Sequence, residues 1–312
     1  MARIALIGEL NLDLIVTGAP GLPELGTEKI VGGMELTLGS SSAIMACQLA
    51  RLGEDVRFIS KVGADDFGRR ALDFLRARGV PTEFATVDAS LSTGLTISIA
   101  VGNDRAQLTH LGCIEEMRLA DLDFDALADR QHLHISAFYV QRNLRADVGR
   151  IFARAHELGL TTSLDTGWPQ EEAAGRDFAA ALAQTDIFLP NEMEAMRLSG
   201  KGSVEEALDW LTERVPAVVI KLGPDGAVAR RGEETVRRPA FDIQPVDTTG
   251  AGDSFNGGFL HAHLKGASLG ECLDLGNACG ALSTRAAGGT TSQATLAEAE
   301  ELVCSAPRRR PA

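Results

Sequence analysis

The run of small residues DTTGAGD at positions 247–253, followed directly by SFNGGF at positions 254–259, has the clearest chemical character in the chain. Small residues let a turn expose its backbone N–H groups as a nest for an anion, and a helix that begins there adds the positive end of its dipole. Asp253 would lie beside that anion, where accepting the proton of an attacking hydroxyl gives a carboxylate a task. The segment therefore predicts a small-molecule phosphotransferase. A capped turn is the simpler interpretation of residues 250–253 taken alone.

Polar groups that could hold a small ligand lie near the start of the chain. Asn11 and Asp13 follow the apolar run 4–8, and together they could clamp vicinal hydroxyl groups, although a polar turn is the alternative. A second small-residue turn precedes the helical pattern at 43–53. Its hydroxyls and bare amides can bind a polar ligand, or can simply cap the helix. The candidates in this turn are Gly39, Ser40 and Ser41.

Two further polar turns follow apolar runs in the second half of the chain. The first, PNEME at 190–194, combines Asn191 with carboxylates, a set suited to a Mg²⁺ ion held largely through water, or to an ordinary helix start. The second, KLGPDG at 221–226, has the composition of a plain Pro-Asp-Gly turn. Both belong at strand ends, where ligands of α/β proteins bind.

Short apolar runs alternate with helical patterns along most of the chain. This alternation predicts an α/β fold with a doubly wound, mostly parallel sheet. The expected strands are 4–8, 56–62, 133–138, 161–164, 187–189 and 217–222, and the expected helices include 43–53, 68–78 and 145–158.

Two segments interrupt the alternation and predict a small β-sheet lid. Residues 94–101 and 106–111 form a strand pattern on either side of a Gly-Asn-Asp turn, which indicates a hairpin. Residues 12–16 and 28–38 contain further short strand patterns. A lid built from about 12–38 and 93–112 could cover a site at the strand ends. No linker composition or repeat divides the chain, so 1–312 is expected to be a single domain.

Composition limits the classes of partner. The 312 residues carry a formal charge of −13, which argues against nucleic acid or an anionic membrane as the main partner. The one basic run, Arg308-Arg309-Arg310, is expected to be a frayed, solvated end. Five cysteines without CxxC spacing are typical of reduced thiols, and the first apolar run is too short for a signal segment. A cytoplasmic location is expected.

The ordered set of motifs from Asn11 to about Gly289 resembles the ribokinase-like, PfkB-type carbohydrate kinases. The resemblance implies that Asp253 is the catalytic base and that the amides of Gly250, Ala251 and Gly252 form the anion hole. It implies that Asp13 binds sugar hydroxyls, and it matches residues 38–53 to the first signature of the family. Ser40 replaces a glycine of that signature and Ile44 replaces an asparagine that helps to hold the sugar, so the identity of the substrate stays open.

The same resemblance implies roles for the remaining motifs. Asn191 and Glu194 match an Asn-x-x-Glu motif that positions Mg²⁺ and phosphate. Asp247 and Thr249 match residues whose backbone carbonyls contribute to a monovalent-cation site, with K⁺ as the candidate ion. Some relatives pair their lids, so a homodimer through the lid is an option. The nucleotide side is matched by Lys221, Gly223, Gly226 and Asn277.

The function expected from these residues is transfer of the γ-phosphoryl group of ATP, with Mg²⁺, to a hydroxyl of a sugar or sugar-like molecule. A nucleoside kinase of the same fold and a non-catalytic ligand-binding relative are the alternatives. A dinucleotide oxidoreductase and a P-loop kinase are excluded, because neither Gly-x-Gly-x-x-Gly after the first strand nor a Walker-type motif occurs.

Overall fold

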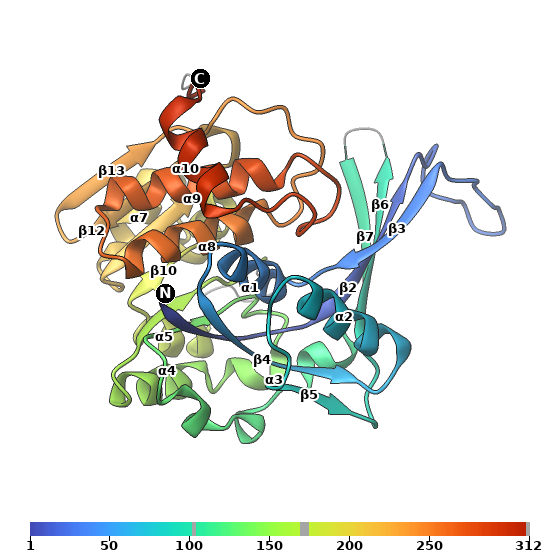
Figure 1. Cartoon of the computed structure of the whole chain (residues 1–312), viewed down its shortest axis with the longest axis horizontal. Helices are drawn as coiled ribbons and strands as arrows, with labels where there is room; N and C mark the ends of the chain where they lie inside the picture. The colour runs from blue at the N-terminus through green and yellow to red at the C-terminus, as the bar shows by residue number, and fades with distance from the viewer. Residues whose placement is uncertain (102–103, 169–174, 310–312) are drawn as a thin grey trace.

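The computed structural model describes residues 1–101, 104–168 and 175–309. Within these residues a nine-stranded sheet crosses the body of the molecule in the order β13-β12-β11-β10-β9-β8-β1-β4-β5 (Figure 1). Neighbouring strands from β11 to β5 are parallel, and β12 and β13 add an antiparallel edge. The strands are β1 Arg3–Ile7, β4 Asp55–Gly63, β5 Ala85–Asp88, β8 His132–Ile135, β9 Thr161–Leu164, β10 Ile187–Phe188, β11 Ala217–Lys221, β12 Ala227–Arg231 and β13 Glu234–Arg238.

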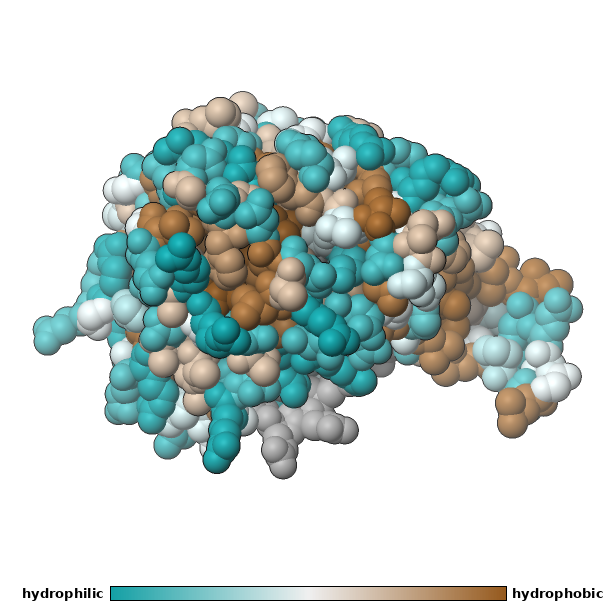
Figure 2. Space-filling model, turned by 90° about the horizontal axis from the view of Figure 1, so that it is seen from below, coloured by the Kyte–Doolittle hydropathy of each residue, from teal (hydrophilic) through white to brown (hydrophobic). Residues whose placement is uncertain are grey.

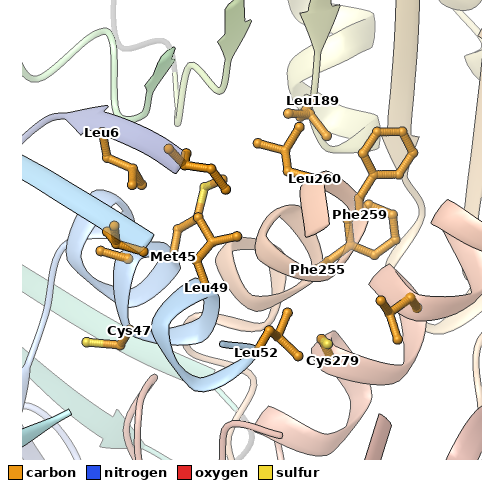
Figure 3. Close-up of a cluster of buried hydrophobic side chains, with 14 of the residues drawn as sticks. Leu6, Met45, Cys47, Leu49, Leu52, Leu189, Phe255, Phe259, Leu260 and Cys279 are labelled. Atoms are coloured by element: carbon orange, nitrogen blue, oxygen red, sulfur yellow. The ribbon is translucent and has the colours of Figure 1, made fainter. Parts of the chain in front are cut away.

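Helices cover both faces of this sheet, as the alternation along β1 requires. Ile4 and Leu6 belong to a core with α1, α2, α8, α9 and α10, part of which is drawn in Figure 3. Ala5 and Ile7 point to the opposite face and belong to a second core with α3 to α7. The helices are α1 Ser41–Arg51, α2 Asp66–Ala77, α3 Arg142–Arg145, α4 Val148–Glu157, α5 Arg176–Leu182, α6 Glu192–Ser199, α7 Val204–Thr212, α8 Ala251–Leu264, α9 Leu269–Ser283 and α10 Leu296–Ser305.

The predicted doubly wound architecture is confirmed, with local differences in the bounds of elements. The strand expected at 133–138 ends at Ile135, because Ala137 has a φ of 51° and turns the chain out of the sheet. The helix expected at 145–158 is divided into α3 and α4. Short 3₁₀ helices lie in the described connections, at Gly112–Glu115, Leu119–Asp121, Phe124–Leu127 and Gly223–Asp225.

The predicted lid sheet is confirmed as a four-stranded mixed sheet in the order β3-β2-β6-β7, and it projects from the body in Figure 1. Strands β2 and β6 are parallel, and β3 and β7 pair antiparallel at the two edges. The predicted hairpin is β6 with β7, and residues 102–103 of its turn lie outside the described part. The strands are β2 Asn11–Thr17, β3 Gly33–Leu38, β6 Gly94–Val101 and β7 Asp104–His110.

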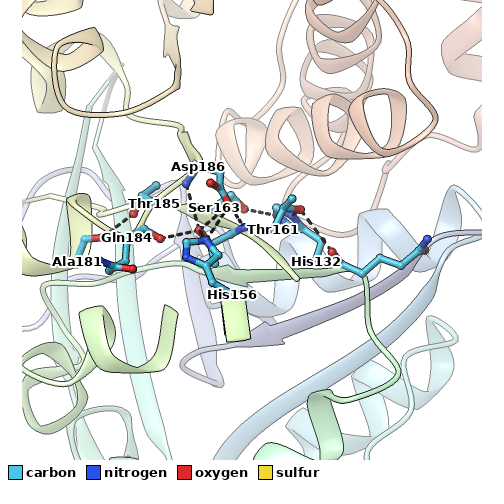
Figure 4. Close-up of polar contacts among 10 residues, drawn as sticks. His132, His156, Thr161, Ser163, Ala181, Gln184, Thr185 and Asp186 are labelled. Carbon is cyan, nitrogen blue, oxygen red and sulfur yellow. Dashed lines mark hydrogen bonds and ion pairs between the residues drawn. The ribbon is translucent and has the colours of Figure 1, made fainter. Parts of the chain in front are cut away.

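A ladder of buried polar side chains crosses the middle of the main sheet between β8 and β9. His132 contacts the hydroxyls of Thr161 and Ser163, each at 2.7 Å (Figure 4). His134 contacts the same Ser163 hydroxyl at 2.6 Å and Ser136 at 2.7 Å. Burial lowers the pKa of both histidines, that of His134 to about 4, so both rings are neutral and each nitrogen has one hydroxyl partner. The ladder satisfies polar groups at the centre of the sheet.

Arg308 and Arg309 of the basic run are not frayed, contrary to the sequence-based expectation, and Arg310 lies outside the described residues. Phe241 and Arg308 form an antiparallel β-bridge, and the Arg309 N–H donates to the Ala240 carbonyl at 2.8 Å. A cation–π contact, with the Arg308 guanidinium 3.9 Å from the Phe241 ring centre, holds the same segment. The expectation failed because the bridge partners lie far apart in sequence. None of the helices in the described ranges is long and apolar enough to cross a membrane.

Candidate active site

Two cavities adjoin at the carboxyl ends of the parallel strands. The larger, of about 570 Å³, is lined by Asp165 after β9, Asn191 after β10 and Lys221 at the end of β11. The smaller, of about 290 Å³, lies between residues that follow β1 and residues of the lid sheet. Ser41 and Gly167 line both cavities, so a ligand in one would approach a ligand in the other.

The structure brings most of the predicted site residues to these cavities. Asn11, Asp13, Ser40 and Ser41 line the smaller cavity. The larger is lined by Asn191, Glu194, Lys221, Gly223, Gly226, Ala251, Gly252, Asp253 and Asn277. Gly39, Gly250, Asp247 and Thr249 are not among the lining residues.

The predicted nest is the first turn of α8. Gly250, with a φ of 73°, precedes the helix, and a Cβ atom there would lie 2.8 Å from Gly289 Cα, so the turn requires glycine. The Ala251 N–H donates to the Thr248 carbonyl at 3.2 Å. Of the three amides of the predicted anion hole, that of Ala251 is therefore engaged within the turn, and that of Gly252 lies in the first turn of α8, at a residue that lines the larger cavity.

Asp253 lies in this first turn with its carboxyl group facing a confined, charged environment. Burial raises the pKa of Asp253 to about 7, with a contribution from Asp165 that Lys221 opposes. A hydrogen bond with the Ser41 side chain also lowers this pKa. Because Ser41 lines both cavities, Asp253 is placed where they meet. A carboxyl group with a pKa near neutrality at such a junction suits a general base.

Lys221 forms an ion pair with Asp165 directly behind the nest. Its Nζ lies 2.6 Å from Asp165 Oδ2 and 3.2 Å from Asn256 Oδ1, and Asn256 Nδ2 donates to the same Asp165 oxygen at 2.7 Å. Burial works against the charged ammonium, but Asp165 and Glu194 outweigh it and raise the Lys221 pKa. The lysine is therefore a fixed cation. Its Nζ lies 3.6 Å from the point that a Cβ atom at position 252 would occupy.

The substrate-side residues fold tightly around Gly39. A Cβ atom at this position would lie 2.3 Å from Asp13 Oδ1 and 2.7 Å from Asn11 Nδ2, so only glycine fits beneath the two side chains. Asn11 Nδ2 in turn donates to Asp13 Oδ1 at 3.2 Å. The predicted clamp of amide and carboxylate is thus assembled on β2, at the wall of the smaller cavity.

Ser40 occupies the position where the family signature has glycine, and it keeps a glycine-like conformation with a φ of 74°. Two hydrogen bonds compensate for this strain, since its hydroxyl donates to the Glu9 carbonyl at 2.5 Å and accepts from the Ala43 N–H at 3.0 Å. Glu9 is itself buried, accepts the Ser42 hydroxyl at 2.6 Å and lines the smaller cavity. Burial raises its pKa.

Ile44, at the position of the family asparagine, does not face the substrate cavity. Its side chain packs between Gly250 and Gly289, whose Cβ positions would lie 3.0 Å and 2.5 Å from it. The replacement therefore supports the turn before α8.

Asn191 and Glu194 form the start of α6 as a reciprocal cap. The Asn191 side chain accepts the Glu194 N–H at 2.9 Å, and Glu194 Oε2 accepts the Asn191 N–H at 2.8 Å. Burial, and then Asp165, raise the Glu194 pKa to about 7. Asn191 and Glu194 thus start the helix and also line the larger cavity. A nearby cation would favour the ionised form of Glu194.

The remaining candidates shape the far end of the larger cavity. Gly226 has a φ of 93°, and a Cβ atom there would lie 2.0 Å from the Arg238 carbonyl oxygen. Asn277 Nδ2 donates to the Arg238 and Pro239 carbonyls at 3.3 Å and 3.4 Å. Gly223 adopts a φ of 58° in the same turn. These contacts hold residues 238–240 against the cavity.

Asp247 ties the segment that contains Thr249, where a monovalent cation is predicted, to the segment 284–288. Asp247 Oδ1 accepts the Thr249 N–H at 2.9 Å, and Asp247 Oδ2 accepts the Gly288 N–H at 2.9 Å. The Asp247 N–H donates to the Thr284 carbonyl at 3.2 Å. The segments lie side by side, as a carbonyl-ligated site requires. The described residues contain no group of three or more His, Cys, Asp or Glu side chains that could hold a metal ion.

The comparisons with known proteins agree with this geometry. Residues 1–296 match the profile of the pfkB family carbohydrate kinases. The chain belongs to this family. It is a carbohydrate kinase of an ATP-binding family, a transferase that phosphorylates a sugar hydroxyl.

Relatives within the pfkB family cover most of the chain. An uncharacterized sugar kinase of Archaeoglobus fulgidus is 32% identical over 73% of this chain and 91% of its own length. An ATP-dependent ribose-1-phosphate kinase of Halopiger xanaduensis is 30% identical over 91% of this chain and 92% of its own. The E. coli protein provisionally named ribokinase II, solved with ATP and Mg²⁺, is 26% identical with a TM-score of 0.85 over 97% and 99% of the two chains.

Three residues that line the cavities are not among the predicted site residues. Asp165 follows the apolar run 161–164, and its partner Lys221 is 56 positions away in sequence. Glu9 follows the first apolar run, and it is buried against Ser42 from another element. Arg309 was assigned to a frayed end, yet it lines the larger cavity.

Proposed function

We propose that this pfkB-family kinase transfers the γ-phosphoryl group of ATP to a hydroxyl of a neutral sugar or polyol, with Asp253 as the general base. The position of Asp253 carries the proposal: it lies in the first turn of α8, lines the larger cavity and contacts Ser41, which lines both. ATP would occupy the larger cavity and the sugar the smaller one. Residues 1–312 would act as one kinase domain, with the lid sheet covering the sugar.

Each group near Asp253 then has a defined task. Asp253 accepts the proton of the attacking hydroxyl, and the Gly252 amide together with Lys221 stabilises the charge on the transferred group. Asn11 and Asp13 orient the sugar. Glu194 would hold Mg²⁺ through water; the ion would neutralise phosphate charge.

The smaller cavity favours an uncharged substrate. It is lined by the carboxyl groups of Glu9 and Asp13 and by neutral polar groups that include Asn11, Thr96 and Gln107, and no Lys or Arg is among its described lining residues. The Asp13 carboxylate would repel a phosphate or carboxylate on the sugar, and none of these lining residues offers a cation to offset the repulsion. We therefore expect kcat/KM for a neutral sugar to be roughly tenfold or more higher than kcat/KM for the phosphorylated form of the same sugar.

An ADP-release assay with ATP and Mg²⁺ tests this expectation. The panel contains pentoses, hexoses, polyols, sugar acids, sugar phosphates and nucleosides, each with K⁺ or choline as the only monovalent cation, so that a role for Asp247 and Thr249 is tested too. Because the Halopiger relative is named a ribose-1-phosphate kinase, ribose and ribose 1-phosphate form the decisive pair. Preference for the phosphate would contradict the neutral-substrate proposal, and preference for nucleosides would favour a nucleoside kinase. ATP binding without any turnover would favour a non-catalytic relative.

The lid sheet would also join two copies of the chain. Large hydrophobic side chains of the lid region are exposed to solvent, namely Leu25 (104% relative exposure), Ile30 (88%), Met34 (69%) and Leu108 (67%). Figure 2 shows hydrophobic residues on the arm that this region forms. Because such a surface is costly to leave in water, we expect the protein to sediment as a dimer and Leu108→Asp to shift it to monomers. Val87→Asp, at a 53% exposed site on β5, is the control. A monomeric wild type would contradict the dimer.

A further inference from the structure

The C-terminal segment 307–309 is built into the wall of the larger cavity. Its backbone pairs with residues 240–242: the Asp242 N–H donates to the Pro307 carbonyl at 3.2 Å, and the Arg309 N–H donates to the Ala240 carbonyl at 2.8 Å. Residues 240–242 are themselves held near Asn277 through the Pro239 carbonyl. The tail is therefore an added edge on the cavity wall.

Arg308 fastens this edge through three separate contacts. Its guanidinium lies 3.9 Å from the centre of the buried Phe241 ring, donates to the Pro239 carbonyl at 3.2 Å and approaches Asp274 Oδ1 of α9 at 2.8 Å. The side chain of Arg308 is only 26% exposed. Such a set of contacts gives the next residue, Arg309, a fixed position.

Arg309 lines the larger cavity at its apolar end. The neighbouring lining residues are Ala240, Phe241, Ile243 and Pro245, whereas Lys221, Gly252 and Asp253 lie at the polar end. An apolar end beside a polar end matches a nucleotide, whose flat base needs apolar walls and whose phosphates need cations and amides. Arg309 Nε lies 3.5 Å from Asp242 Oδ1, and Asp242 is 56% exposed, so this pair holds the guanidinium only weakly.

We propose that Arg309 is a nucleotide-binding residue, whose planar guanidinium packs against the base of ATP, and that segment 307–309 is part of the nucleotide site. The inference rests on the proposed function, since ATP is the nucleotide assumed. A guanidinium stacks on an aromatic face, whereas an ammonium on a flexible stem does so poorly. The basic tail of this acidic chain thereby acquires a specific task.

Calorimetric titration of ATP without sugar tests the inference independently of turnover. We expect Arg309→Ala to raise the Kd for ATP roughly fivefold, and Arg309→Lys to recover little of the loss. In steady-state assays the KM for ATP should rise while kcat and the KM for the sugar stay within about twofold of the wild-type values. Arg237→Ala removes a comparable exposed arginine on β13 that does not line the cavity, and should change nothing.

The outcomes separate this inference from the proposed function. ATP binding by the wild type that Arg309→Ala leaves unchanged would overturn the inference alone. If Arg309→Ala weakens ATP binding but the wild type phosphorylates no sugar, the inference is supported and the proposed sugar-kinase function is contradicted. A wild type that does not bind ATP would overturn both. If Arg309→Ala unfolds at the same temperature as the wild type, a loss of ATP affinity reflects the missing side chain and not a damaged fold.

Discussion

Replacing Asp253 with asparagine is expected to lower kcat by roughly 10²–10⁴-fold, the usual cost of losing a general base. The amide has nearly the shape of the carboxyl group, so the first turn of α8 and its contact with Ser41 should be kept. The measurement is ADP release under saturating ATP and sugar. A rate near that of the wild type would remove Asp253 from this role. Asp73→Asn, on the exposed surface of α2, is the matched control.

The pH dependence of the wild type gives a second test of the same residue. A base must be ionised, and the pKa of Asp253 is raised to about 7 by burial and by Asp165. We therefore expect kcat/KM, which reports the free enzyme, to fall about tenfold per unit below pH 7. The residual activity of Asp253→Asn should lack the part of this dependence that Asp253 contributes. Glu194 also has a pKa of about 7, so any acidic limb that remains in the variant would belong to Glu194.

The same substitution should make the protein more stable. A carboxyl group whose pKa is higher in the folded chain than in the unfolded chain costs stability at every pH above its unfolded pKa, here 3.8. Near pH 7 the ionised form of Asp253 therefore opposes folding, and Asp253→Asn should raise the free energy of unfolding by up to about 4 kcal/mol. Denaturant unfolding at pH 7 and at pH 4 measures this gain, which should shrink at the lower pH.

The features predicted well from sequence are those that depend on local backbone shape. Gly250 and Asp253 lie in one turn, and small residues before a helix define that turn whatever surrounds it. The strand 161–164 was predicted with the bounds that the structure has, because two β-favouring threonines open it shortly after Gly159 ends the preceding helix. The doubly wound sheet followed from the same kind of local alternation.

The residues that sequence reasoning missed depend on partners far away in the chain. Nothing near Asp165 indicates that a lysine 56 positions later will neutralise it, and the Arg308 contact with Phe241 joins positions 67 apart. The role of Ile44 also depends on residues that are distant in sequence. Its replacement of asparagine was expected to bear on the substrate, and only the packing against Gly250 and Gly289 reveals a structural role.

Replacing Lys221 with methionine is expected to lower kcat by about 10²-fold or more, because the ammonium would no longer face the charge that develops beside Gly252. The substitution also leaves Asp165 buried without its cation, which typically costs about 3–5 kcal/mol of stability. A loss of activity in this variant alone would thus have two explanations, chemistry and unfolding.

The double variant Asp165→Asn/Lys221→Met separates the two explanations. It removes both charges, so the stability lost in the single variant should largely return, while the rate should stay low if Lys221 acts on the phosphoryl group. Recovery of both stability and rate would reduce Lys221 to a partner of Asp165. The pair Lys61 and Asp121, 2.7 Å apart and away from both cavities, supplies the matched control.

The pH profile distinguishes the variants further. Lys221 lowers the pKa of Asp253 and Asp165 raises it, so Lys221→Met should move the acidic limb of kcat/KM to higher pH. The double variant should bring the limb back toward the wild-type position, because the two shifts oppose each other. Lys61 and Asp121 lie outside the cavities, so the control variant Lys61→Met/Asp121→Asn should keep the acidic limb of kcat/KM at the wild-type pH. Lys221 would thus have two effects besides neutralising Asp165. It would favour the ionised form of Asp253 near neutral pH, and it would stabilise the charge on the phosphoryl group beside Gly252.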